Sequence, residues 1–188
     1  MPRQPRIEGA GLIHHVTGHS MTEVDAFPDD AAKRGFLTLL ARATATLDWR
    51  VFAYCLLSSH YHLLVETERP NLGEGMRRIQ GSHAGRLNVR LTRSGPLWRD
   101  RFHSRVVETS AYVLQAAVYI DTNPVAAGLC KRAEGWRWSS YRANVGLAEP
   151  PFWHRVDRLH EHLGAESGEA PVVYRELVAA AVELALAR

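Results

Sequence analysis

Residues 49–67 read WRVFAYCLLSSHYHLLVET, and this stretch decides the fold class. Apolar and other side chains alternate on both sides of two serines, Ser58 and Ser59. Alternation is typical of a strand, because successive side chains point to opposite faces of the sheet. Two such runs joined by a short polar pair favour a hairpin. The stretch therefore predicts two antiparallel strands with their turn at Ser58-Ser59.

Working outward, the flanking segments add strands and helices in a regular order. Apolar spacing, an Asp29 or Asp30 cap and the break at Asn123-Pro124 set their bounds. The expected elements are a strand at 11–17, a helix at 29–47, a helix at 72–92, a strand at 97–108 and a helix at 109–124. With the hairpin, this order is β-α-β-β-α-β-α. It predicts an α+β fold, a ferredoxin-like antiparallel sheet with helices packed on one face.

The length suits one main domain followed by a tail. We expect a catalytic domain at residues 1–145 and a helical C-terminal extension at 146–188, with an alanine-rich helix at 171–187. No apolar stretch approaches the roughly 18 residues of a membrane span, and the first residues lack the apolar core of a signal peptide. A soluble, cytoplasmic protein without a membrane partner is expected.

Arginine dominates the positive charge, with 21 arginines and two lysines. Residues 69–105 carry a net charge of +7, and the rest of the chain carries −4. A run of this kind suits a surface that follows a phosphate backbone, although genomic base composition also produces arginine bias. The candidate DNA contacts are Arg78, Arg86 and Arg93 along the helix at 72–92, and Arg99, Arg101 and Arg105 alternating along the strand at 97–108.

Two histidines, His60 and His62, alternate on the second strand of the hairpin. Alternation puts both on one face, ~6–7 Å apart along the chain. Two imidazoles so placed can share a divalent ion, and a structural role stays open on spacing alone. His160 and His162 have the same spacing, but their surroundings are typical of a helix, where residues two apart do not face each other.

Tyr119 and Asn123 lie four residues apart on the helix at 109–124, and so on one face of it. A phenol can attack phosphorus when its proton is removed and the phosphodiester is polarised. The amide oxygen of Asn123 can complete a metal site that two imidazoles leave open. The alternative is a core tyrosine followed by a helix cap. Tyr112 lies seven residues earlier on the same face, and we expect it to be a packing residue.

Several motifs together resemble one family. SSHYHLLVET resembles the histidine-hydrophobic-histidine motif of single-tyrosine transposases, and YIDTNPVAAGL resembles the nucleophile helix of their REP-associated branch. IHHVTGHS, GPLWRDRFHSRVVE and WRWSSYRA also match that branch in order. The chain thus resembles the REP-associated tyrosine transposases over residues 11–145. It departs from them at His19 and Ser20, where the family usually has Arg-Gly, and at Ser59, where asparagine is common.

The resemblance implies specific roles. His60 and His62 would be metal ligands, Asn123 the third ligand, and Mg²⁺ or Mn²⁺ the ion. Tyr119 would attack single-stranded hairpin DNA of the REP type, form a 5′-phosphotyrosine and release a 3′-hydroxyl. Two alternatives remain: a domesticated relative that binds DNA hairpins without cutting them, and a metal-dependent nuclease that uses water. Whether the chain acts as a monomer or a homodimer stays open.

Overall fold

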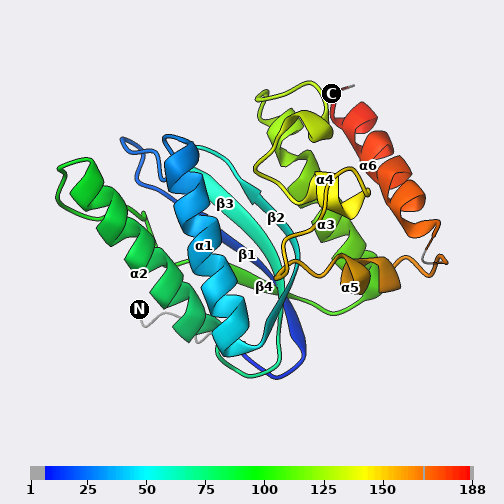
Figure 1. Ribbon diagram of the computed structural model, residues 1–188, viewed down its shortest axis with the longest axis horizontal. Coiled ribbons are helices and arrows are strands. Elements are labelled where there is room, and N and C mark those ends of the chain that lie inside the picture. Colours follow the sequence, from blue (N-terminus) through cyan, green and yellow to red (C-terminus); the bar gives the residue numbers. More distant parts are fainter. Residues whose placement is uncertain (1–6, 167, 187–188) are drawn as a thin grey trace.

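The computed structural model describes residues 7–166 and 168–186, and the expected order of elements is present in it (Figure 1). The strands are β1 (Leu12–His19), β2 (Trp49–Leu56), β3 (His60–Thr67) and β4 (His103–Val107). The helices are α1 (Asp30–Leu47), α2 (Leu72–Arg90), α3 (Ser110–Ala126), the 3-10 turn η1 (Ala133–Gly135), α4 (Tyr141–Asn144), α5 (Val156–Glu161) and α6 (Ala170–Leu186). No helix of the described part is long and apolar enough to cross a membrane.

The four strands form one antiparallel sheet in the order β2-β3-β1-β4. This confirms the predicted α+β, ferredoxin-like topology. The hairpin of β2 and β3 turns at Ser58 and Ser59, as its sequence predicted. Because β1 pairs with β3, the register sets His19 opposite His60 and Thr17 opposite His62. The motif histidines therefore lie on a central strand of the sheet.

Helices cover both faces of the sheet, so the prediction of helices on one face is wrong (Figure 1). Leu63 packs with α1 and α2 in one core, while its neighbour Leu64 packs with α3 and α6 in a second. The physical reason is that β2 and β3 are apolar on both sides, and only Arg50 and His60 in them are less than fully buried. A strand that is apolar on both sides needs a cover on each.

A helix cap on α1 and one close contact between α2 and a tryptophan ring position these two helices. Asp29 caps α1 by accepting a hydrogen bond from the amide of Ala32 at 2.9 Å. On α2, a Cβ at Gly75 would lie 2.2 Å from Cζ2 of Trp49. Glycine is therefore required at position 75, where α2 crosses the indole of Trp49. This requirement explains why the helix contains a residue with low helix propensity there.

Two bounds differ from the sequence prediction. β4 starts at His103 instead of residue 97, because Trp98 makes only an isolated bridge with Ser20 before the chain bends. Helix α3 continues through Pro124 to Ala126. A proline in the last turn costs the helix a single hydrogen bond, and the amide of Ala127 still donates to the carbonyl of Asn123 at 2.9 Å.

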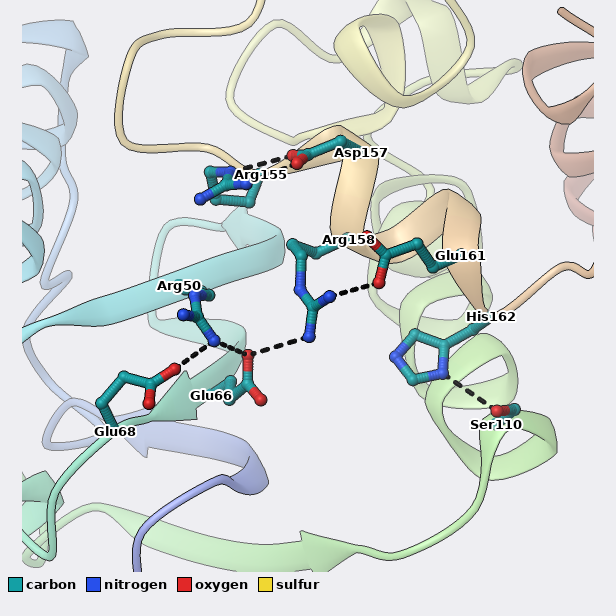
Figure 2. A network of polar contacts seen from close by, with 9 residues as sticks. All are labelled: Arg50, Glu66, Glu68, Ser110, Arg155, Asp157, Arg158, Glu161 and His162. Carbon is teal, nitrogen blue, oxygen red and sulfur yellow. Dashed lines mark hydrogen bonds and ion pairs between the residues drawn. The ribbon is translucent and has the colours of Figure 1, made fainter. Parts of the chain in front are cut away.

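The C-terminal segments pack onto the face that α3 covers. Tyr174 and Val178 of α6 are buried in the second core. Ion pairs attach α5 to the end of the sheet, where Glu66 lies between Arg50 at 3.0 Å and Arg158 at 3.8 Å (Figure 2). The residues after 145 thus complete the hydrophobic cover of the sheet.

A buried histidine in this C-terminal segment makes stability depend on pH. Burial lowers the pKa of His154 from 6.5 to about 4, and its Nε2 lies 3.1 Å from the carbonyl of Phe52. The unfolded chain takes up this proton near pH 6.5, whereas the folded chain resists it until about pH 4. The free energy of unfolding should therefore fall as the pH drops through this window, by on the order of 3 kcal/mol from this group.

The test compares wild type with His154→Gln, which can still donate to the carbonyl but does not titrate. Urea unfolding at pH 7.5 and at pH 4.5 should show a smaller acid loss in the variant, by on the order of 2 kcal/mol. An equal loss in both proteins would contradict the assignment.

Candidate active site

Histidines from β1 and β3 gather on the face of the sheet that α3 covers. The rings of His60 and His62 have centroids 5.2 Å apart. His19 stacks on His60 with a centroid distance of 4.7 Å, and His15 lies 5.4 Å from His62. The sheet register explains the grouping, since strand residues that share a face in paired strands are neighbours.

Helix α3 brings the predicted nucleophile and the predicted third ligand to these rings. Tyr119 is 53% exposed, and its ring centroid lies 5.5 Å from that of His62 and 5.9 Å from that of His15. Asn123, one turn later, is buried and lies close enough to the side chain of His60 to raise the pKa of that ring. The structure therefore assembles all four residues that the sequence singled out, with Tyr119 open to solvent.

The rings are held in their neutral form. Burial, with smaller contributions from the neighbouring His15, His60 and His19, lowers the pKa of His62 from 6.5 to about 3. Burial, followed by the neighbouring His19, also lowers the pKa of His60, although the side chain of Asn123 acts in the opposite direction. Burial is also the main cause that lowers the pKa of His15, and the positive charge of Arg105 lowers it further. Neutral imidazoles keep a lone pair, which is the form that binds metal ions.

The ring nitrogens suit a metal site. Nδ1 of His62 faces Nε2 of His15 at 3.2 Å, and Nδ1 of His60 faces the hydroxyl of Ser59 at 3.1 Å. Nε2 of His62 is buried, with no hydrogen-bond partner among the described residues. No three His, Cys, Asp or Glu side chains of the described part are grouped to hold a metal. An ion here would take the amide oxygen of Asn123, a hard donor, together with the two imidazoles.

A groove of about 280 Å³ opens beside Tyr119, between α3 and the edge strand β4. Its lining includes His15, Arg105, Gln115 and Tyr112. Tyr112 is 57% exposed, so the expectation that it is a packing residue is wrong. Its side chain lines this groove instead of packing into either core. Tyr119 itself is among the residues that line the groove.

The predicted DNA contacts separate into two groups. Arg105 on β4 and Arg99 in the loop before it lie close enough to lower the pKa values of His15 and His19. Arg101 is exposed in the same loop, so only Arg105 is on the strand that was expected to carry all three.

The arginines of the α2 region lie on the other side of the sheet (Figure 1). Arg78 pairs with Glu74, and Arg86 is exposed. Arg93 lies beyond the end of the helix, where it donates to Asn88 Oδ1 at 2.6 Å. These three are therefore not brought to the histidines.

Sequence reasoning missed two of the cluster's histidines, His15 and His19. A signal was present in IHHVTGHS, where His15 and His19 are four residues apart and share a face once the strand continues past residue 17, the end that was predicted for it. What the sequence alone does not give is the pairing of β1 with β3, which brings both rings to the motif. His160 and His162 do not face each other, as expected for a helix. His160 faces the carbonyl of Asn144, and His162 faces the hydroxyl of Ser110 (Figure 2).

A buried carboxylate anchors α3 from behind. Asp121 accepts hydrogen bonds from Ser140 Oγ at 2.6 Å, Asn144 Nδ2 at 3.0 Å and the Tyr174 hydroxyl at 2.9 Å. Burial raises the pKa of Asp121 to about 6, and the three hydrogen bonds oppose that rise. Because Asp121 is two residues from Tyr119, this cluster ties the helix of the candidate nucleophile to α4 and α6.

Removing one donor from that cluster should cost stability. Tyr174→Phe leaves a buried carboxylate with one partner fewer, so the free energy of unfolding should fall by about 1–3 kcal/mol. Tyr112→Phe removes the same hydroxyl from an exposed tyrosine of α3 and should change it by less than about 0.5 kcal/mol. Urea unfolding of the two variants tests this, and equal losses would show that the contact with Asp121 contributes nothing.

No protein-family model and no curated protein matches the sequence. The chain is similar to a solved structure of a REP-associated tyrosine transposase bound to a REP hairpin, with a TM-score of 0.68 and 15% identity over 81% of this chain and 90% of that one. A candidate transposase from Deinococcus radiodurans R1 is 17% identical over 64% of this chain and 97% of its own, but its TM-score of 0.43 is too low to support an inference. The chain thus has the fold of a REP-associated tyrosine transposase.

Proposed function

We propose that this protein cleaves single-stranded hairpin DNA and transfers the strand, with Tyr119 as nucleophile and a divalent metal ion as cofactor. One observation carries the proposal. An exposed phenol lies 5.5 Å, ring to ring, from a buried histidine whose Nε2 has no partner among the described residues. A core tyrosine, the alternative considered from sequence, would not be half exposed beside a groove.

His60, His62 and Asn123 would hold the ion. When bound, Mg²⁺ or Mn²⁺ would polarise the scissile phosphate and offset the charge that develops on it. The neutral state of the two imidazoles supports ligation at neutral pH, because no proton has to leave first.

The chain's own residues account for the chemical step. The Tyr119 oxygen attacks phosphorus while the phosphorus–O3′ bond breaks, which gives a 5′-phosphotyrosine and a 3′-hydroxyl. The phenol loses one proton and the departing oxygen gains one, so the step is balanced without ATP. One phosphoester replaces another, and attack by a 3′-hydroxyl on the phosphotyrosine would rejoin the same strand or a different one.

The substrate class follows from charge and access. Arg99, near His19, and Arg105, near His15, can bind phosphates of a strand that enters the site. The groove between α3 and β4, which Tyr119 lines, would hold the single strand. Arg78, Arg86 and Arg93 on the α2 side, together with Arg101, would contact the duplex part of the hairpin. The similar transposase structure is bound to a REP hairpin, which supports hairpin DNA of that kind.

The experiment incubates purified protein with labelled hairpin DNA that carries single-stranded flanks, in Mn²⁺ or in EDTA. A denaturing protein gel should show a covalent protein–DNA adduct in Mn²⁺ alone. Cleaved DNA without an adduct would favour the metal-dependent nuclease that uses water. Hairpin binding with neither product would favour the non-cutting relative.

A further inference from the structure

His15 stands out because neither the motif nor the proposed step assigns it a task, yet it touches the centre of the site. Its Nε2 lies 3.2 Å from Nδ1 of His62, within hydrogen-bond distance. It is half-buried and lines the groove beside Tyr119. It comes from β1, two positions away from the residue paired with His62.

The contact between the two rings allows only two arrangements of one proton. If His15 donates, Nδ1 of His62 is the acceptor, and the proton of that neutral ring sits on Nε2. If His62 donates from Nδ1, its Nε2 has a free lone pair. Only the second arrangement can ligate an ion through Nε2, the nitrogen that is buried and lacks a partner among the described residues.

We infer that His15 is a positioning residue, which accepts a hydrogen bond from Nδ1–H of His62 and so directs the Nε2 lone pair of that ring to the ion. The inference rests on the metal-dependent function proposed above. A histidine that binds a metal commonly has its other nitrogen held by a neighbour, which fixes both the tautomer and the ring plane.

The second ligand has a comparable neighbour, which makes the arrangement consistent across the site. Nδ1 of His60 faces the hydroxyl of Ser59 at 3.1 Å. Both ligands therefore have a polar partner on Nδ1, one from the hairpin turn and one from β1. Of the two, His15 is the firmer support, because a strand residue in a sheet is held more rigidly than a serine in a turn.

Three variants separate orientation from packing. His15→Phe keeps the ring volume and removes the acceptor, whereas His15→Gln supplies an amide oxygen that can still accept from Nδ1–H. His14→Phe makes the same exchange one residue earlier on the opposite face, where the buried ring has no hydrogen-bond partner among the described residues. It controls for the loss of a histidine from β1.

The first readout needs no metal. In ¹⁵N NMR spectra of the metal-free protein, His62 should be protonated at Nδ1 in wild type, His15→Gln and His14→Phe. In His15→Phe, the proton should move to Nε2 or exchange between the two nitrogens. The same His62 tautomer in wild type and His15→Phe would overturn the inference.

The second readout is Mn²⁺ affinity, followed by the paramagnetic resonance signal of the free ion. His15→Phe should weaken binding by about 10- to 100-fold, and His15→Gln should stay within about threefold of wild type. Phenylalanine and glutamine variants of equal affinity would overturn the inference. If wild type binds no Mn²⁺ while the tautomers follow the expected pattern, the metal-dependent function fails and the orienting role of His15 stands.

Discussion

Tyr119→Phe is expected to abolish the covalent adduct with hairpin DNA, lowering adduct formation by at least about 10³-fold. The change removes one oxygen, and that oxygen is the proposed nucleophile. Hairpin affinity should stay within about threefold, because the half-exposed ring keeps its contacts with His15 and His62. Adduct formation is measured on a denaturing gel, and hairpin affinity in a separate binding assay.

Tyr112→Phe is the matched control. Tyr112 lies on the same face of α3, lines the same groove and is 57% exposed, so it is the other phenol that DNA can reach. Its ring has no stacking contact with the histidine cluster among the contacts described, whereas Tyr119 contacts two of its rings. The adduct should persist in this variant. Persistence in Tyr119→Phe with loss in Tyr112→Phe would exchange the two roles.

The hairpin is the part of the fold that the sequence predicts best. Alternation in β2 and β3 and the serine pair between them depend on neighbours along the chain, and these predictions are confirmed. The same alternation places His60 and His62 on one face. Helical spacing does the same for Tyr119 and Asn123, and the structure brings both pairs together.

The rest depends on contacts between segments distant in the chain. His15 joins the site through the pairing of β1 with β3, which no local pattern specifies. The expected strand at 97–108 was too long, because alternation of Arg99 with Arg101 looks the same in a loop as in a strand. The face of the sheet that each helix covers could not be predicted either, because strands that are apolar on both faces favour neither face for a helix.

The role of Asp121 could not be predicted from the sequence, for a different reason. A lone aspartate in an apolar helix has no sequence signature of its role, since its three donors come from residues 19, 23 and 53 positions later. Its cluster shows that the C-terminal segments support the helix of Tyr119. The expectation that they form a separate extension stays a prediction about domain organisation.

Alanine at either motif histidine should remove cleavage while leaving the fold and hairpin binding in place. His60→Ala and His62→Ala each delete one of three proposed ligands, so the Mn²⁺-dependent adduct should fall by at least about 10²-fold. Their pKa values are lowered by burial, so neither ring is a cation at neutral pH that could bind DNA phosphates. Hairpin affinity should therefore change by no more than about threefold.

His162→Ala is the control for these variants. His162 is two positions from His160, the same spacing as in the motif, but its Nδ1 faces the hydroxyl of Ser110 at 3.0 Å and not the histidine cluster. It should form the adduct at the wild-type rate. Circular dichroism and urea unfolding establish whether each variant is folded, since His62 is buried and its loss leaves a cavity. A folded His62→Ala protein that still forms the adduct at full rate in Mn²⁺ would remove His62 from the metal site. If both alanine variants lost hairpin binding while folded, the two histidines would have to contact DNA directly, and the division between ion-holding histidines and phosphate-binding arginines would be wrong.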